Sequence, residues 1–507
     1  MEERWAKLLG YVGLPLIVAT FFATAAAHFG YTPDDAFIYF RFARNLAQGG
    51  GIAFNAGEPT YGVTGPLWLF LVSAGAATGA DIPMAAKAVD LFIAAGSIIV
   101  FYLAVGALVR DGIASLLSTL AFSVNVWFLR WAGSGMETSL AVCLILGAVF
   151  FVLRNDYLLA TVATAMLTLV RPEGALFLAF VLADLILNSH DRRRGATLAL
   201  KYAAVFAGLL LPWLLYAYRT FGTVVPNTAL AKSHDGLGVA SLAAGISNIA
   251  QIVGASEGVA LGALIVAGAY LWRRLREASP DQRFYWGRAA LLLAGWPVAL
   301  VLLYLGRNVT VVSRYMLLAT PLLLILTFAI VFEAVAYSRF TKFGYAGIFL
   351  LAGLVLLQNQ VVYRAVVRPG IEAFEEGMDA SLISIGRWLH DHTRPDETVL
   401  CWDIGAIGYY SDRRICDAAG LVTPGMIKDV AAGRDLREIV EGRLYEPYCT
   451  VSFVVHRDEA PDALAADGHL VPLFSRPFFR IGLLKMRQDY YTVYHVEGGT
   501  DRRKETP

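Results

Sequence analysis

Two adjacent carboxylates, Asp34 and Asp35, stand in the stretch YTPDDAFIYFRFARN (31–45), directly after the first long apolar run. An acidic pair beside a membrane exit is costly unless it is solvated, paired or used. Such a pair can act as a general base on an incoming hydroxyl group, or hold a divalent cation such as Mg²⁺ or Mn²⁺ through oxygen ligands. The competing interpretation is structural, because Thr32 or either aspartate can cap the helix that follows.

Basic and aromatic side chains follow the pair within one predicted helix. Arg41 and Arg44 are three residues apart, so they occupy neighbouring positions on one helical surface. A guanidinium group is planar and always charged, which suits it to binding phosphate, although arginines at a membrane boundary also reach for lipid headgroups. Tyr39 and Asn45 lie on the same helix and are candidates to line a site.

Four further polar insertions interrupt the apolar runs, in WAGSGMETSL, TLVRPEGALF, YRTFGTVVPNTALAKSHDG and GRNVTVVSRYMLL. Each one alone is best explained as a charge at a helix end. Their joint placement on one side of the membrane, which follows from the loop charges, makes them candidates for a common site. The candidate residues are Glu137, Arg171, Glu173, Asn227, Lys232, Arg314 and Tyr315.

The composition is that of a membrane protein. Of the 507 residues, 57% are hydrophobic and 16% are charged, whereas a soluble protein carries roughly a quarter charged residues. The apolar residues form runs of about 20 positions, the length that crosses a bilayer core. The net charge of +1 gives no electrostatic case for nucleic acid as a partner.

The positions of Lys and Arg predict the topology. They concentrate in HDRRRG, LWRRLREASPDQR and SRFTK, and cytoplasmic loops are the ones enriched in these residues. All three clusters fall on the side of the amino terminus if the short, Gly-rich segment 65–81 lies along the membrane surface instead of crossing it. We therefore predict about eleven spans with the amino end in the cytoplasm. They are 8–29, 88–109, 113–130, 138–153, 157–170, 174–188, 198–218, 248–272, 288–306, 315–335 and 343–363.

The carboxy-terminal part has the composition of a soluble protein. We expect a transmembrane domain at 1–366 and an extracytoplasmic soluble α/β domain at 367–507, on the same side as the carboxylate pair. TVLCWD, RRICDAAG, TVSFVVH and YYTVYHV are typical of strands, and ASLISIGRWLHDHT has helical spacing. DIGAIGYYSD carries two glycines between strand signals but matches no nucleotide-binding fingerprint, so nucleotide binding is not favoured.

The first apolar run and the cysteines bear on processing and redox state. The run is too long for the core of a signal peptide, so we interpret it as a retained span.

Cys143, Cys401, Cys416 and Cys449 fit neither a zinc pattern nor a disulfide framework. Three of them lie in the polar tail, where one bridge and buried free thiols are both open alternatives.

The acidic pair with its following helix resembles the GT-C superfamily of polyprenyl-phosphate-sugar glycosyltransferases. GMETSL, RPEG, VVPNTALAK, SRYMLL and DIGAIGYYSDRRICDAAGLV, in this order, extend the resemblance over most of the chain, to about residue 425. Within the superfamily it looks most similar to the mycobacterial terminal arabinofuranosyltransferases, which use decaprenyl-phosphoryl-arabinofuranose, and to their uncharacterised bacterial relatives. The resemblance implies a polytopic α-helical membrane protein of GT-C type, with surface-lying helices in the first outward loop and a small C-terminal soluble α/β domain.

The resemblance also implies roles for individual residues. Asp34 corresponds to the catalytic carboxylate of the first outward loop, with Asp35 supporting it or sharing a cation, and Glu137 to a second acidic residue. The pair is Asp-Asp where other branches have Asp-x-Asp or Asp-Glu, so the need for a metal stays open. The expected donor-phosphate ligands are Arg41, Arg44, Arg171, Lys232 and Arg314.

The expected function is transfer of a single sugar, with arabinofuranose as a candidate, from a polyprenyl-phosphate donor by an inverting displacement. The acceptor is a glycan, lipid or protein at the outer face of the bacterial inner membrane, and membrane lipid is the other expected partner. A transporter of lipid-linked sugars is an alternative that would use Asp90, Asp184 and Glu257 as relay groups, but the sequence lacks the internal repeats usual in transporters. A non-catalytic envelope-assembly subunit is a further alternative, which would not need Asp34.

Overall fold

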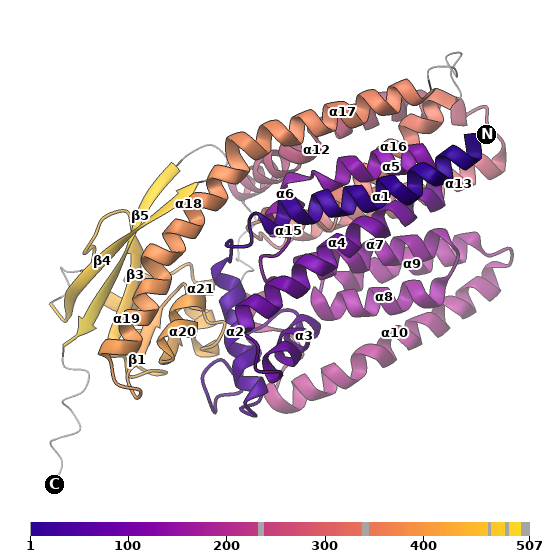
Figure 1. Ribbon diagram of the computed structural model, residues 1–507. Helices are drawn as coiled ribbons and strands as arrows, with labels where there is room; N and C mark the ends of the chain where they lie inside the picture. The colour runs from indigo at the N-terminus through magenta and orange to yellow at the C-terminus, as the bar shows by residue number, and fades with distance from the viewer. Residues whose placement is uncertain (1, 232–237, 337–343, 465–467, 482–485, 498–507) are drawn as a thin grey trace, which may run out of the picture. The chain divides into compact units, whose positions relative to one another are not determined.

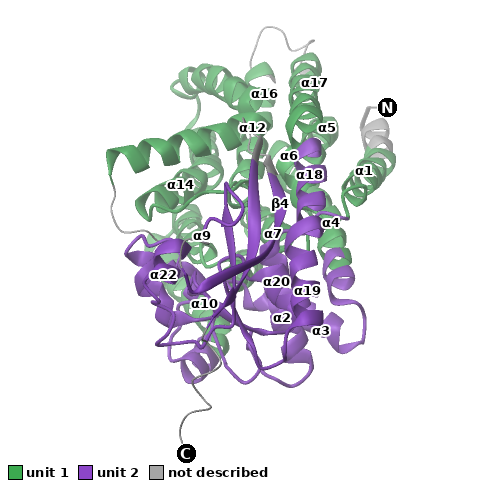
Figure 2. Cartoon of the chain, turned by 90° about the vertical axis from the view of Figure 1, so that its left-hand side faces the viewer, with its two compact units in different colours: residues 1–29, 88–213, 237–367 green, residues 30–87, 214–236, 368–507 purple. Residues whose placement is uncertain are grey.

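The computed structural model describes residues 2–231, 238–336, 344–464, 468–481 and 486–497 (Figure 1). The chain divides into two compact units, coloured separately in Figure 2. Unit 1 consists of Met1–Phe29, Ala88–Trp213 and Leu237–Val367, and unit 2 of Gly30–Lys87, Leu214–Gly236 and Arg368–Pro507. Unit 2 therefore combines the whole carboxy-terminal region with two loops from the first half of the chain.

Apolar helices make up unit 1, and each of the eleven predicted spans corresponds to one, two or three of them. Among the residues that the structure describes, five helices are long and apolar enough to cross a membrane, at Ile82–Val109, Arg192–Phe221, Val239–Leu275, Pro280–Gly306 and Tyr345–His392. The chain is thus a polytopic α-helical membrane protein, as predicted. The helices in and at the borders of this unit are α1 (Glu2–Ala26), α4 (Ile82–Val109), α5 (Gly112–Ser123), α6 (Val126–Trp131), α7 (Thr138–Leu153), α8 (Tyr157–Val170), α9 (Gly174–Asn188), α10 (Arg192–Phe221), α12 (Val239–Leu275), α13 (Pro280–Ala290), the π-helix η1 (Leu291–Gly295), α14 (Trp296–Gly306), α15 (Ser313–Met316), α16 (Thr320–Ala336), α17 (Gly344–Val362) and the π-helix η3 (Tyr363–Val367).

Two predicted spans differ from the helices observed. The span 113–130 is divided into α5 and α6, because Asn125 caps α6 by accepting hydrogen bonds from the amides of Trp127 (3.1 Å) and Phe128 (3.0 Å). Asparagine is among the best N-cap residues, and here it starts a new helix inside an apolar run. The span 315–335 is shorter than predicted, since α16 begins only at Thr320.

The first loop contributes two helices to unit 2, α2 (Asp34–Ala47) and α3 (Pro66–Ala77). The 12 residues of α3 rise about 18 Å, well short of a hydrocarbon core about 30 Å thick. This helix packs against α2 within unit 2. The segment 65–81 therefore contains a short helix of unit 2, and its place along the membrane surface stays a prediction.

The five strands of unit 2 form one mixed sheet in the order β2-β1-β3-β5-β4. β1 is parallel to β2 and β3, whereas β5 is antiparallel to β3 and β4. Four strands lie at the predicted positions, whereas β4, which contains Pro472 and Pro477, has no counterpart among the predicted strands. Proline is tolerated here because β4 is at the edge of the sheet. The strands are β1 (Thr398–Cys401), β2 (Arg414–Asp417), β3 (Phe453–Asp458), β4 (Leu470–Ile481) and β5 (Met486–Val496).

Helices of unit 2 cover the sheet and connect its strands. α18 packs against β4, as Figure 1 shows, and the helix predicted in ASLISIGRWLHDHT is present as η4 and α19. A disulfide joins Cys416 to Cys449 in the apolar core beside the sheet, whereas Cys143 and Cys401 are free. The remaining helices are α11 (Asn227–Ala231), α18 (Arg368–Met378), the π-helix η4 (Asp379–Ile383), α19 (Ser384–His392), α20 (Gly405–Ser411), the 3₁₀ helix η5 (Pro424–Met426), α21 (Ile427–Ala431) and α22 (Leu436–Glu441).

Candidate functional site

The Asp34 carboxylate connects the first loop to the carboxy-terminal region inside unit 2. Its Oδ2 accepts a hydrogen bond from the amide of Gly405 (2.9 Å), and its Oδ1 accepts one from the amide of Ala406 (2.7 Å). These amides begin α20, so Asp34 satisfies the exposed N–H groups of a helix some 370 residues away in sequence. The N-cap residue of α2 is Pro33, which makes no side-chain cap hydrogen bond, and Asp34 and Asp35 lie in the first turn, where negative charge is favourable.

Glycines in DIGAIG allow this approach of α20 to α2. A Cβ atom on Gly405 would lie 1.9 Å from the carbonyl oxygen of Asp34, far inside any real contact. A Cβ atom on Gly408 would lie 2.7 Å from the ring of Phe54. The two glycines that stand between strand signals are therefore explained by close packing of two helices, with no need for a nucleotide.

The surroundings of Asp34 raise its pKa to about 7. Burial is the largest cause, and the negative charges of Asp403 and Asp35 add to it, while the amides of Ala406 and Gly405 act in the opposite direction. A carboxyl group that titrates near neutral pH is matched to general-base chemistry. Each carboxylate oxygen has two acceptor positions, so one amide bond per oxygen leaves room for a substrate hydroxyl.

Asp403 belongs to a polar network that sequence reasoning missed. It follows β1 directly, and its Oδ2 accepts a hydrogen bond from the Tyr491 hydroxyl (2.7 Å) and pairs with Arg457 (3.1 Å). The signal was present, because polar residues at the carboxyl ends of parallel strands commonly line binding sites. The strand signal in TVLCWD ends at Cys401, and Asp403 stands just beyond the carboxyl end of the strand.

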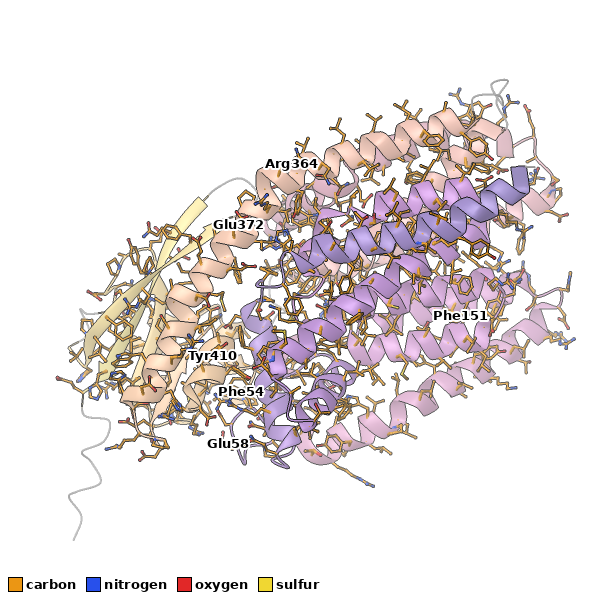
Figure 3. The ribbon with its side chains drawn as sticks, viewed as in Figure 1. Phe54, Glu58, Phe151, Arg364, Glu372 and Tyr410 are labelled. Carbon is orange, nitrogen blue, oxygen red and sulfur yellow. A yellow bond between two sulfur atoms is a disulfide. The ribbon has the colours of Figure 1, made fainter. Side chains whose placement is uncertain are left out.

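Arg41 does not have the environment expected of a phosphate ligand. It is 4% exposed, and its guanidinium group donates to the carbonyl oxygens of Phe54 (2.8 Å), Gly408 and Arg413 (2.7 Å). It also stacks over the ring of Phe54, labelled in Figure 3, at 4.4 Å. Since backbone carbonyls already occupy the guanidinium fork, we do not keep Arg41 among the proposed phosphate ligands.

Arg44 also reaches the segment that follows α20. It forms an ion pair with Asp412 (2.7 Å), and its guanidinium lies 5.0 Å from the centre of the Tyr409 ring. The Arg44 side chain is 23% exposed, so part of it faces solvent. Together the two arginines of α2 hold residues 408–413 in place.

Three other candidates of unit 2 brace its loops. The Tyr39 hydroxyl accepts a hydrogen bond from the amide of Gly65 (3.0 Å). The Asn45 side chain donates to the carbonyl of Ala53 (2.8 Å), and that of Asn227 donates to the carbonyl of Leu421 (2.9 Å). Lys232 lies outside the described residues.

In unit 1 the motifs GMETSL, RPEG and SRYMLL meet in one charged network. Arg171, which is 5% exposed, pairs with Glu137 (3.0 Å) and with Glu173 (3.1 Å). Glu173 also accepts a hydrogen bond from the hydroxyl of Tyr304 (2.9 Å). Glu137 Oε2, Glu173 Oε2 and Arg171 Nε are buried without a hydrogen-bond partner among the described residues, so the network retains unused donors and acceptors.

Aromatic rings enclose the cations of this network. The guanidinium of Arg171 lies 4.6 Å from the centre of the Tyr315 ring. That of Arg314 lies 5.1 Å from the Trp131 ring and 5.5 Å from the Tyr315 ring. Five residues predicted from three separate motifs, Glu137, Arg171, Glu173, Arg314 and Tyr315, are thus brought together in unit 1.

The carboxylates that a transporter would use as relay groups have separate partners. Asp184 forms an ion pair with Arg288 (2.7 Å). Asp90 accepts a hydrogen bond from the amide of Gly135 (3.0 Å), and Glu257 accepts one from Asn125 (2.7 Å). They do not form a relay with one another through these contacts.

The acidic pair does not belong to a ready-made metal site. Among the described residues, no three His, Cys, Asp or Glu side chains are grouped so as to hold a metal ion. Each Asp34 oxygen accepts an amide hydrogen bond. This bond uses part of the acceptor capacity that a metal ion would need. A Mg²⁺ or Mn²⁺ requirement stays a prediction for experiment.

Comparison with solved structures identifies the fold. ArnT from Cupriavidus metallidurans in the apo state has a TM-score of 0.59 and 13% identity, covering 94% of this chain and 97% of that one. The same protein bound to undecaprenyl phosphate gives 0.56 and 13%, covering 96% and 98%. The archaeal oligosaccharyltransferase AglB from Archaeoglobus fulgidus, in complex with an inhibitory peptide and a dolichol-phosphate, gives 0.55 and 12%, covering 88% and 69%. The chain has the GT-C fold.

Sequence comparisons add one match in the carboxy-terminal region. Residues 370–500 match a domain of unknown function, DUF8728. No curated protein matches the chain. The resemblance to arabinofuranosyltransferases therefore stays an expectation, and the structural neighbours are similar in fold at 12–13% identity.

Proposed function

We propose that this protein is a membrane glycosyltransferase that moves a single sugar from a polyprenyl-phosphate donor to an acceptor hydroxyl. The observation that carries the proposal is the environment of Asp34, a half-buried carboxylate held by two backbone amides with its pKa raised to about 7. The GT-C fold, found also in ArnT bound to undecaprenyl phosphate, supports the class of donor.

The proposed step is a single displacement. Asp34 accepts the proton of the acceptor hydroxyl while that oxygen attacks the anomeric carbon of the donor. The bond between this carbon and the phosphate oxygen breaks, its electron pair leaves with the phosphate, and the configuration inverts. Arg171, Arg314 and Lys232 are the proposed phosphate ligands, since fixed cations stabilise the charge that develops on a leaving phosphate. Arg44 is proposed to assist the phosphate ligands. Asp35 is proposed to support Asp34, and Glu137 is proposed as a second acidic residue.

The proposed compartment is the outer face of the bacterial inner membrane. Disulfides persist in oxidising compartments, and the Cys416–Cys449 bridge lies in unit 2. Three segments that the loop charges predict on the outer side, the first loop, the connection after α10 and the tail, are the segments that form unit 2. Both observations support an outward-facing unit 2 with a cytoplasmic amino end.

The identity of the sugar and the identity of the acceptor are further proposals. Arabinofuranose is the sugar to offer first, on the resemblance to arabinofuranosyltransferases, and a glycan is the acceptor to offer before lipid or protein. The two alternative functions are a transporter of lipid-linked sugars and a non-catalytic assembly subunit. The experiment described next distinguishes both from a transferase.

Purified full-length protein should be offered a panel of radiolabelled polyprenyl-phosphate sugars, with and without EDTA. We expect a new glycosidic product from at least one donor, formed about 10²–10⁴-fold more slowly by Asp34→Ala and Asp34→Asn. EDTA abolishes the product if a divalent cation takes part. Movement of the lipid without a glycosidic product would support transport, and full activity of both Asp34 variants would contradict the catalytic assignment.

A further inference from the structure

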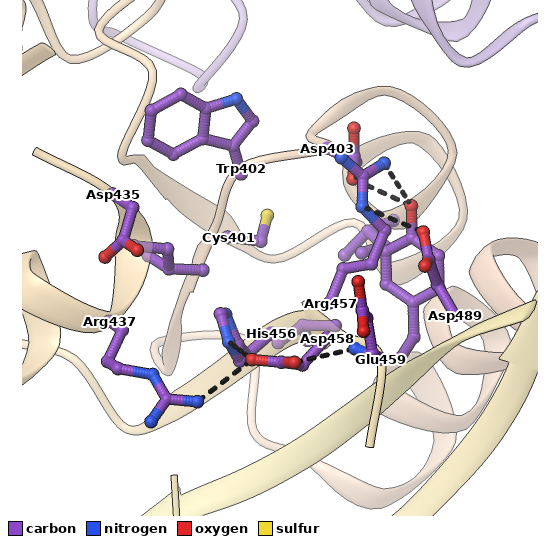
Figure 4. A pocket seen from close by; sticks show the side chains of 14 residues that line it. Cys401, Trp402, Asp403, Asp435, Arg437, His456, Arg457, Asp458, Glu459 and Asp489 are labelled. Carbon is purple, nitrogen blue, oxygen red and sulfur yellow. Dashed lines mark hydrogen bonds and ion pairs between the residues drawn. The ribbon is translucent and has the colours of Figure 1, made fainter. Parts of the chain in front are cut away.

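A cavity of about 340 Å³ opens in unit 2 at the carboxyl ends of the parallel strands β1 and β3 (Figure 4). Its size falls within the range of small-molecule sites, and this edge of a sheet is where α/β folds commonly bind ligands. Trp402 and Asp403 follow β1, and residues 455–459 belong to or follow β3. The walls are Cys401, Trp402, Asp403, Ile407, Asp435, Leu436, Arg437, Val455, His456, Arg457, Asp458, Glu459, Asp489 and Tyr491.

The charge of the walls excludes an anionic ligand. Five carboxylates line the cavity and only two arginines oppose them, so the walls carry net negative charge. Both arginines are also paired, Arg437 with Asp458 (3.0 Å) and Arg457 with Asp403 (3.1 Å). A phosphate or a nucleotide would meet repulsion here, whereas a neutral ligand rich in hydroxyl groups would find acceptors and donors already held in place.

His456 provides an acceptor whose partner is missing. It is 8% exposed, and its Nε2 lies 3.3 Å from Oδ2 of Asp458, which assigns the ring proton to Nε2. Its Nδ1 is buried with no hydrogen-bond partner among the described residues. Burial lowers the pKa of His456, so the ring is neutral at pH 7 and Nδ1 is an acceptor. An unsatisfied buried acceptor in a cavity wall is satisfied by a hydroxyl donor of a ligand.

We propose that this cavity binds a neutral sugar residue of the acceptor glycan. Hydroxyl groups would donate to the His456 imidazole and to the fixed carboxylates, while Trp402 offers an aromatic surface to the apolar face of a sugar ring. Asp403 lines the cavity. The charge of Asp403 also raises the pKa of Asp34, so the two carboxyl groups are close to each other. The cavity and the proposed base are thus neighbours within unit 2, and in this sense the inference rests on the proposed function.

The binding test uses full-length protein in detergent and no donor. Saturation-transfer NMR with methyl α-arabinofuranoside, methyl β-glucopyranoside and methyl phosphate, each of which has methyl protons that report binding, should detect at least one glycoside and give no signal for the phosphate. His456→Leu should weaken glycoside binding about tenfold, the effect of one lost hydrogen bond to a buried group, and Arg437→Gln, at a side chain that is 42% exposed, should weaken it less. Arg434→Gln is the matched control, because the Arg434 side chain is about as exposed as that of Arg437 and forms an ion pair with Asp429 (2.8 Å) outside the cavity.

Unchanged binding in both cavity variants, or binding of phosphate in place of sugar, would overturn the inference. The thermal unfolding midpoint of each variant should stay within the range of the control, which separates loss of binding from loss of folding. Asp34→Asn should still bind the glycoside. Glycoside binding in a protein that makes no product would reject the proposed function alone, whereas transfer with an unaltered acceptor KM in the cavity variants would reject the cavity alone.

Discussion

The amide of Gly405 donates a hydrogen bond of 2.9 Å to the carboxylate of Asp34, across 371 positions of sequence. The donor begins α20 and the acceptor begins α2, so the starts of two helices from opposite ends of the chain face each other. The acidic pair and the DIGAIG motif are therefore parts of one structure. Their separate sequence signals could not reveal this.

Replacing Gly405 by alanine should destabilise unit 2. The added Cβ atom would lie 1.9 Å from a backbone oxygen of Asp34, which cannot move as a flexible side chain would. Overpacking of this kind costs about 1–3 kcal/mol. The thermal unfolding midpoint, measured on purified protein in detergent, should fall. Gly468→Ala is the control, because a Cβ atom at Gly468 meets nothing within 4 Å, and equal midpoints for the two variants would contradict the close contact.

The transfer rate should depend on pH through Asp34. A base must be ionised to accept a proton, and the pKa of Asp34 is raised to about 7, so kcat/KM should rise as pH increases through 7 and then level off. Asp34→Asn should remove this rising part of the pH profile, the acidic limb, and lower the rate by about 10²–10⁴-fold. Asp35→Asn should keep activity but move the limb to lower pH, because the charge of Asp35 raises the pKa of Asp34. A limb that stays at the same pH in Asp35→Asn would contradict this coupling.

Removing Arg171 alone should be more harmful than removing its whole network. Arg171→Gln leaves Glu137 and Glu173 buried without their cation, which costs about 3–5 kcal/mol. The triple variant Arg171→Gln, Glu137→Gln, Glu173→Gln removes the charges together and should regain much of the thermal stability. If Arg171 binds the donor phosphate, the triple variant should remain inactive. Recovery of transfer along with stability would reduce Arg171 to a structural role.

The bridge between Cys416 and Cys449 should stabilise unit 2. It closes a loop of 33 residues, for which chain entropy gives about 3.7 kcal/mol. Alkylation of denatured protein should modify two thiols, Cys143 and Cys401, without reductant and four after reduction, as counted by mass spectrometry. Cys416→Ala with Cys449→Ala should lower the unfolding midpoint, and Cys143→Ala serves as the control. Four reactive thiols before reduction would show that the bridge is absent.

The orientation can be measured with single added cysteines. Arg434 lies in unit 2 and Arg276 follows α12 in unit 1, and both are exposed. A membrane-impermeant maleimide added to spheroplasts should label Arg434→Cys at once and Arg276→Cys only after permeabilisation, with the unmodified protein giving the background. The reverse pattern would place unit 2 in the cytoplasm and remove the basis for an extracytoplasmic transferase.

The long, apolar helices were predictable, because length and hydropathy decide them locally. Helices α7, α8 and α9 begin and end at the predicted residues. The strands β1, β2, β3 and β5 were predictable for the same reason, since β-branched and aromatic residues bounded by turn residues are a local signal. The strand β4 was missed because the sequence alone does not tell an edge position, where Pro472 and Pro477 are allowed, from a central one.

The sequence indicates the candidate residues of the site, whereas their contacts could not be predicted from it. Glu137, Arg171 and Arg314 were found by their positions at helix ends, and the structure brings them together in unit 1. The carbonyl partners of Arg41, Gly408 and Arg413, could not be predicted because they lie more than 360 positions further along the chain. Contacts at such separation leave no periodic pattern in a single sequence, and so the roles of these side chains emerge only from the fold.

The buried guanidinium of Arg41 has a consequence for biogenesis. Its acceptor in Gly408 is synthesised 367 residues later, and at 5–20 residues per second the ribosome needs about 20–70 s to reach it. During that time α2 has been released from the ribosome without the carbonyls that will surround its arginine. A transcript truncated before codon 413 would insert the helices already made and leave this arginine without its native acceptors, a defect that membrane proteases can recognise.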